Sequence, residues 1–241
     1  MSTVPLRRVC ATPRTIAGLC RCRPQRQLQQ QRRCLSSASA GGTESDTVGF
    51  VGLGKIGFAM ARNMMNAGHS LTVFDLDPAA VERLVAEGAT AAGSVAEAAA
   101  ATSRLVTVLP NDAILHSVVA EVRDALPAGS VHVGCSTVSP QAARAVAAVH
   151  DAHGSTYVSA PVFARPDGMA LGQATIPVSG PAAGLARIKP LLEATSTGVF
   201  EFGEDVGASN VVKLGGNFLI ASAIESMAES MALAEANGVD R

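Results

Sequence analysis

The chain has 241 residues, a formal net charge of −1 and 48% hydrophobic residues. Eight of its 19 basic residues lie in the first 35 positions, which hold no acid, so the rest carries 11 basic against 20 acidic residues, or −9. Such an acidic chain argues against nucleic acid or an anionic membrane as partner. We find no uninterrupted apolar run of transmembrane length, and the remaining residues suffice for a full α/β core.

Residues 1–45 have the composition of an organelle transit peptide and linker, because they are rich in Arg, Ser and Gln and poor in acids. Arg33 followed by Cys34, Leu35 and Ser36 predicts cleavage near Ser36. We expect a mitochondrial location, with a plastid or a basic disordered tail as the alternatives. Only Cys135 of five cysteines follows this segment, which predicts neither disulfides nor a metal site.

The stretch 48–75 predicts a strand, a turn, a helix and a second strand. The apolar run 48–51 leads into Gly52, Gly54 and Gly57 in the spacing G-x-G-x-x-G, and a helical pattern follows. A second apolar run, 71–74, ends at Asp75, 18 positions after Gly57. This context makes the glycine pattern a specific signal for dinucleotide binding, whereas the alternative is a glycine-rich turn that binds nothing.

Each part of this unit has a physical task. Gly52 allows a tight turn, Gly54 lets a pyrophosphate approach the backbone, and Gly57 lets the helix pack closely on the strand. The helix N-terminus offers unpaired N–H groups to phosphates, and Asp75 can accept hydrogen bonds from ribose hydroxyls while repelling a 2′-phosphate. We therefore predict NAD rather than NADP as cofactor. The predicted contacts in the turn are Gly52, Leu53, Gly54, Lys55, Ile56 and Gly57.

Strands and helices alternate after Asp75. Helices are expected at 78–85, 95–101, 114–122 and 140–150, with Asp77 and Ser94 as N-caps, and strands at 90–92, 105–109 and 130–134. This alternation predicts a doubly wound parallel sheet, a Rossmann-type dinucleotide-binding domain over 46–205. Ligands bind beyond the carboxyl ends of such strands, where Leu109, Pro110, Ser136 and Thr137 fall.

Three shorter strands are expected at 157–163, 175–179 and 199–202, with a helix at 181–192, as a mixed extension of the same sheet. A long helix then runs from 206 to about 237, the start of a second domain over 206–241. Lys213 and Asn217 lie four residues apart and share a face of this helix. A partly buried Lys can act as a general acid or base, although a solvated Lys with a capping Asn would give the same pattern.

The sequence resembles the β-hydroxyacid dehydrogenase family, which includes 3-hydroxyisobutyrate dehydrogenase and is related to 6-phosphogluconate dehydrogenase. The resemblance rests on GFVGLGKIGFAMARNMMNAGH, VTVLPND, CSTVSP and GASNVVKLGGN, and it runs from Val48 to Asp240. It implies that Leu109 and Pro110 line the cofactor and that Thr137 lies near the nicotinamide. It also implies roles for three further residues: substrate binding for Ser136, catalysis for Lys213, and substrate binding beside that lysine for Asn217.

Two departures from the family pattern stand out. Where the family reads D-A-P-V-S-G-G, this chain reads S-A-P-V-F-A-R, so Phe163, Ala164 and Arg165 replace residues that help to bind the substrate carboxylate. Phe163 cannot donate that hydrogen bond, and Arg165 offers a replacement charge. Family members also carry an all-helical domain after the long helix. We therefore expect an incomplete chain, and a homo-oligomer where that domain exists.

The resemblance implies an oxidoreductase that transfers a hydride between NAD and a small 3-hydroxyacid. A reductase of aldehydes or imines is an alternative, which the apolar Phe163 favours. A non-catalytic NAD(P)-binding protein is a further alternative. The five histidines show no ligand spacing, and Cys135 is expected to be a small buried residue rather than a nucleophile.

Overall fold

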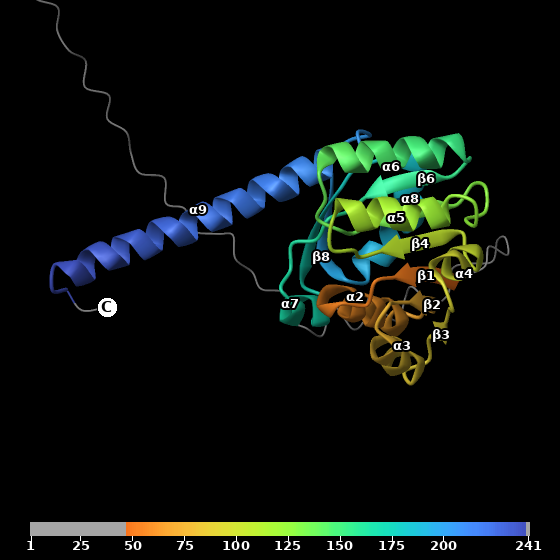
Figure 1. Ribbon diagram of the computed structural model, residues 1–241, viewed down its shortest axis with the longest axis horizontal. Coiled ribbons are helices and arrows are strands. Elements are labelled where there is room, and N and C mark those ends of the chain that lie inside the picture. The colour runs from red at the N-terminus through yellow and green to blue at the C-terminus, as the bar shows by residue number, and fades with distance from the viewer. Residues whose placement is uncertain (1–46, 240–241) are drawn as a thin grey trace, which may run out of the picture. The chain divides into compact units, whose positions relative to one another are not determined.

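The computed structural model describes residues 47–239, so the predicted transit peptide lies outside the described residues. Its centre is a parallel six-stranded sheet in the order β3-β2-β1-β4-β5-β6 (Figure 1). The strands are β1 (Thr47–Val51), β2 (Ser70–Phe74), β3 (Thr90–Ala91), β4 (Arg104–Thr107), β5 (Val131–Gly134) and β6 (Thr156–Ser159). The order reverses between β1 and β4, which confirms the predicted doubly wound Rossmann-type sheet.

Helices cover both faces of this sheet. The helices that follow its strands are α2 (Lys55–Asn66), α3 (Pro78–Val85), α4 (Val95–Ala100), α5 (Asp112–Val122), α6 (Pro140–Ala152) and, after β7, α8 (Ala182–Glu193). Met60 and Met64 of α2 share one buried cluster with Ile188 of α8, whereas α4, α5 and α6 contribute to two other clusters. Figure 1 shows α5 and α6 side by side. Strands buried on both faces explain the continuous apolar runs in the sequence.

Side-chain caps fix where these helices begin. The Asp77 carboxylate accepts a hydrogen bond from the Ala79 N–H, and the Ser94 hydroxyl accepts one from the Glu97 N–H, which confirms both predicted caps. Asn111 and Ser139 cap α5 and α6 in the same way. Because each cap satisfies an N–H that the helix leaves unpaired, the connections at the carboxyl ends of the strands have defined geometry.

The expected mixed extension takes another form. The strands β7 (Ala174–Val178) and β8 (Ser196–Glu201) pair in parallel as a separate two-stranded sheet. Two isolated antiparallel bridges connect it to the rest of the domain: Ser179 pairs with Ser159 at the end of β6, and Thr175 pairs with Phe163 in the segment that follows β6. The predicted strand 157–163 stops at Ser159, and a short unpredicted helix, α7 (Pro166–Ala170), follows.

The long helix α9 (Ala208–Ala236) packs on β7 and α6 through its first turns only. Beyond Lys213 most of its side chains are exposed, including Ile220, Ile224, Met227 and Met231. Among the described residues α9 has the length and composition of a membrane span, with a mean hydropathy of 1.2 over 18 residues. Ala, Ile, Leu and Met raise this average, whereas Ser and Glu residues interrupt the apolar positions. The helix therefore meets the composition criterion without forming the uninterrupted apolar run that the sequence was searched for.

Candidate active site

A pocket of about 720 Å³ opens at the carboxyl ends of β1, β2 and β4. Most residues predicted to contact the cofactor line it; they are Gly52, Gly54, Lys55, Ile56, Gly57, Asp75, Leu109 and Pro110. The pocket also has a wall from α5, with Ile114, Ser117, Val118 and Glu121, which sequence reasoning missed. The helical pattern predicted α5 but did not show which of its residues would face a neighbouring turn.

The three glycines of the turn play different structural parts. Gly52 has a φ of +96°, and a Cβ there would collide with the Val108 carbonyl oxygen. A Cβ on Gly57 would collide with the Gly52 carbonyl oxygen, so the first turn of α2 packs directly on the end of β1. A Cβ on Gly54 would meet nothing within 4 Å. Packing therefore requires Gly52 and Gly57, whereas Gly54 leaves open space at the start of α2.

Asp75 is held at the rim of this pocket by two backbone amides. Its Oδ2 atom accepts a hydrogen bond from the Leu53 N–H at 2.5 Å, and its Oδ1 atom accepts one from the Asp77 N–H at 2.8 Å. The Leu53 side chain is buried, so Leu53 contributes this amide rather than a lining side chain. Each carboxylate oxygen keeps acceptor capacity that can face a ligand.

The start of α2 is suited to an anion. Its N-cap is Gly54, which provides no side-chain cap, and its first turn contains no acid. The first N–H groups of a helix then lack intrahelical partners and carry the positive end of the helix dipole. With Asp75 fixed at one end and open space at Gly54, these residues fit a dinucleotide whose pyrophosphate lies at the helix start.

The turn after β4 depends on a contact that the sequence did not predict. The buried Ser136 hydroxyl accepts a hydrogen bond from the Leu109 N–H at 2.7 Å. Ser136 therefore fixes the Leu109 turn, while its exposed neighbour Thr137 is free to meet a ligand. Neither Ser136 nor Thr137 lines the pocket described above.

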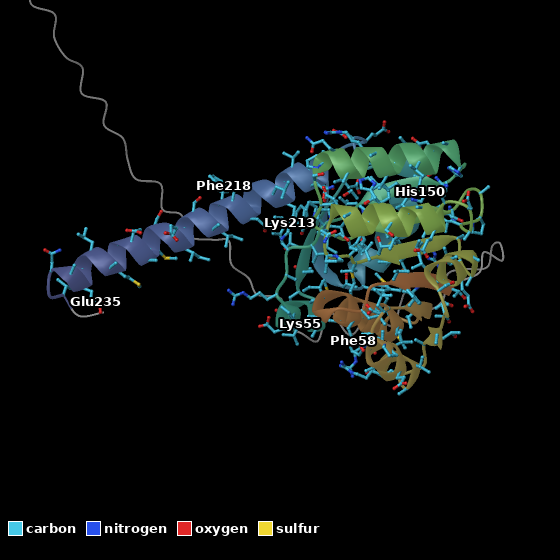
Figure 2. The ribbon with its side chains drawn as sticks, in the orientation of Figure 1. Lys55, Phe58, His150, Lys213, Phe218 and Glu235 are labelled. Atoms are coloured by element: carbon cyan, nitrogen blue, oxygen red, sulfur yellow. The ribbon has the colours of Figure 1, made fainter. Side chains whose placement is uncertain are left out.

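Lys213 lies on the first turns of α9, next to the sheet, as Figure 2 shows. Its side chain is 9% exposed, and burial lowers the pKa of its ammonium group. The Nζ atom lies 4.0 Å from the centre of the Phe163 ring. Asn217, one turn further along, is exposed. A buried amine with a lowered pKa gives up its proton more readily than an exposed lysine, as a general acid or base must.

Two polar side chains one turn before Lys213 anchor α9 to the carboxyl end of β6. The Asn210 Nδ2 atom donates a hydrogen bond to the Ser159 hydroxyl at 2.6 Å, and the Ser209 hydroxyl donates one to the Ser159 carbonyl at 3.1 Å. Since β6 is parallel to β1, β2 and β4, this anchor holds Lys213 at the edge of the sheet where the pocket opens.

The segment that departs from the family pattern follows Ser159 in the chain, and its Phe163 ring lies against α9. The Phe163 N–H donates to the Thr175 carbonyl at 2.9 Å, and the Thr175 N–H donates to the Phe163 carbonyl at 3.1 Å. Ala164 is partly buried against the core. Arg165 is exposed, and its side chain has no hydrogen-bond or ion-pair partner among residues 47–239. The Phe163 backbone is therefore unavailable for substrate, whereas the Arg165 guanidinium is available.

A buried histidine pair lies between β5 and α6. His132 Nδ1 is 2.8 Å from His150 Nε2, and burial lowers the pKa of His150 to about 4 and that of His132 well below its usual value. Cys135 is buried, and burial raises the pKa of its thiol to about 12, so the thiol is not a nucleophile. Within the described part of the chain no cluster of His, Cys, Asp or Glu could hold a metal ion.

Comparisons with known proteins decide the family. Residues 47–203 match the family model described as the NAD binding domain of 6-phosphogluconate dehydrogenase. A curated relative, the 3-hydroxyisobutyrate dehydrogenase of Pseudomonas aeruginosa, is 37% identical over 196 residues, which are 80% of this chain and 65% of the relative. The chain belongs to the β-hydroxyacid dehydrogenase family. The family confirms the prediction of NAD as the cofactor of this domain.

Solved structures show the same relationship. The Mycobacterium tuberculosis 3-hydroxyisobutyrate dehydrogenase, solved with L-serine, superposes with a TM-score of 0.77 at 30% identity, over 80% of this chain and 66% of that one. An imine reductase from Streptomyces aurantiacus superposes with a TM-score of 0.75 at 27% identity, over 80% of this chain and 68% of that one. This β-hydroxyacid dehydrogenase chain spans about two thirds of the length of the curated relatives it matches.

Proposed function

We propose that this protein is an NAD-dependent oxidoreductase that oxidises a small 3-hydroxyacid, as 3-hydroxyisobutyrate dehydrogenase does. The observation that carries the proposal is the position of Lys213. It is a buried amine with a lowered pKa, anchored through Asn210 and Ser159 to the sheet edge where the dinucleotide pocket opens. Family members related to this chain act on substrates of this class, which supports the choice.

In the proposed reaction Lys213 accepts the proton of the substrate hydroxyl group. The pocket lined by Gly54 and Asp75 would hold NAD, which would supply the hydride acceptor for the carbon that bears this hydroxyl, so that the alcohol would become a carbonyl. Burial of Lys213 favours the neutral amine that such a base needs. In this proposal the exposed Asn217 amide would hold the substrate, and the unpaired Arg165 guanidinium would meet the substrate carboxylate.

We further propose that the pocket prefers NAD to NADP. The Asp75 carboxylate is fixed at the rim by the Leu53 and Asp77 amides, and Glu121 also lines the pocket. Two carboxylates would repel a 2′-phosphate, and the residues after Asp75 are Leu76 and Asp77 rather than basic residues.

A second candidate, a reductase of aldehydes or imines, rests on Phe163. The ring covers the Lys213 ammonium and the Phe163 backbone is paired with Thr175, so the place of the family's carboxylate-binding Ser is apolar. An uncharged substrate suits such a wall. The structural similarity to an imine reductase supports this candidate as well.

The two candidates separate in one set of assays on the full chain. NADH formation is measured with 3-hydroxyisobutyrate, L-serine and other 3-hydroxyacids, and NADH consumption with uncharged aldehydes and cyclic imines of similar size. The dehydrogenase proposal predicts at least tenfold higher kcat/KM for the carboxylated substrates, and loss of that preference in Arg165→Ala. Equal or higher kcat/KM for the uncharged substrates would contradict it and support the reductase.

The composition of residues 1–45 leads us to propose import into mitochondria. The eight Arg and the absence of any acid before Glu44 support this location. A fluorescent protein fused behind residues 1–45 is expected to reach mitochondria, and a variant with four of these Arg replaced by Gln should stay in the cytosol. Plastid or cytosolic fluorescence of the unmodified fusion would contradict the proposal.

A further inference from the structure

The Phe163 side chain is held in place from two sides. Its backbone forms the antiparallel bridge with Thr175, through both the N–H and the carbonyl. Its ring lies against α9 at Gly216, where a Cβ would stand 2.6 Å from the ring Cζ atom and 2.7 Å from Cε1. Such distances are far below van der Waals contact, so the ring occupies space that only a glycine leaves open.

Gly216 and Lys213 lie three residues apart and therefore share a face of α9. The ring that lies against Gly216 also lies beneath the Lys213 ammonium, at 4.0 Å from the Nζ atom. A cation at this distance from the face of an aromatic ring is attracted by the ring quadrupole. Gly216, Phe163 and Lys213 thus form one contact group.

The Phe163 ring is the group that contacts the Lys213 ammonium. The ammonium has no hydrogen-bond or ion-pair partner among residues 47–239. Burial alone shifts the pKa of Lys213, with no charged group contributing. β7 has no charged residue, and Arg144 of α6 is paired with Asp205 at 2.7 Å. The other titratable groups of α6 are the neutral His150 and the exposed Asp151.

We propose that Phe163 is a positioning residue for Lys213: its ring, fixed by Gly216, holds the ammonium in the site and sets how readily it loses its proton. The ring stabilises the charged amine, which opposes the effect of burial. Only the relevance of this protonation to catalysis rests on the proposed function, because the protonation of Lys213 can be measured without NAD or substrate.

The test measures the pH dependence of Lys213 acetylation by acetic anhydride on the full chain, followed by mass spectrometry. In Phe163→Leu the apolar cover stays while the ring face is lost, so the midpoint of labelling is expected to fall by about 0.4 to 1.5 pH units. Phe163→Tyr keeps the ring and is expected to keep the wild-type midpoint.

Two adjacent glycines provide a matched pair of variants. Gly216→Ala displaces the ring and is expected to lower the midpoint, whereas Gly215→Ala, whose Cβ would meet nothing within 4 Å, is expected to leave it unchanged. In a Phe163→Leu background Gly216→Ala should add nothing. This pair decides the question even where replacement of Phe163 prevents folding.

Three results would overturn the proposal. The first is a wild-type labelling midpoint in Phe163→Leu, and the second is the same labelling midpoint in Gly216→Ala and Gly215→Ala. The third is a Gly216→Ala shift that is as large in the Phe163→Leu background as in the wild type. Failure of the proposed function gives a different signature. In that case Lys213→Met turns over substrate like the wild type, whatever the labelling of Lys213 shows.

Discussion

Replacing Gly54 by Ala separates what the glycine-rich turn does for folding from what it does for the cofactor. A Cβ on Gly54 would meet nothing within 4 Å, and its backbone, with φ −59° and ψ −176°, is accessible to Ala. We therefore expect an unfolding free energy within about 0.5 kcal/mol of wild type. The new methyl group would, however, stand where a pyrophosphate approaches the start of α2.

The expected loss of affinity follows from the hydrogen bonds at that place. A hydrogen bond to a charged group contributes about 1.5–3 kcal/mol, so the loss of one N–H to phosphate contact raises the Kd for NAD by about 10- to 150-fold. Isothermal titration measures the affinity, and urea denaturation measures the stability of the same sample.

Two further variants serve as controls. Gly57→Ala places a Cβ against the Gly52 carbonyl oxygen and should destabilise the fold by about 1–3 kcal/mol or more. Gly168→Ala on α7 meets open space away from the pocket and should change neither quantity. Unchanged NAD affinity in a folded Gly54→Ala variant would refute the placement of the pyrophosphate.

Three other perturbations give measurable outcomes. Asp75→Ser should lower the ratio of the Kd for NADP to the Kd for NAD at least tenfold. An unchanged ratio would argue against the proposal that this carboxylate repels the 2′-phosphate. Leu105→Ala, which empties a fully buried site, should cost about 2–5 kcal/mol in urea unfolding, whereas less than 1 kcal/mol would contradict the core described above. Because the folded pKa of His150 is about 4 against 6.5 unfolded, the unfolded chain binds more protons between these values. The contribution of His150 to the free energy of unfolding should therefore be complete above pH 6.5 and decrease towards pH 4. The free energy of unfolding should fall less steeply with pH in His150→Gln than in the wild type, and equal slopes would refute this linkage.

The sequence predicted the first half of the domain well, for physical reasons. The run before Gly52, the glycine spacing and the caps Asp77 and Ser94 are local signals, and each acts within a few residues of the structure it specifies. Local signals of this kind also gave the helix that carries Lys213. Agreement between propensity, capping and pattern is what makes these elements predictable.

The parts that were missed depend on contacts between distant residues. Phe163 and Lys213 are 50 positions apart, and His132 and His150 lie on different elements, so no local pattern reports either contact. The helix α7 has only five residues, with Pro166 at its start and Gly168 inside, and shows no helical periodicity. The separate β7–β8 sheet also depends on pairing partners that the sequence does not name.

The central claim is that Lys213 accepts the substrate proton at the edge of an NAD pocket. The most direct test compares wild type with Lys213→Met for two quantities, the rate of NADH formation from the best 3-hydroxyacid and the Kd for NAD. The structure predicts at least a hundredfold loss of kcat with a Kd within about twofold of wild type, because Lys213 does not line the pocket. Undiminished kcat in Lys213→Met would contradict the claim.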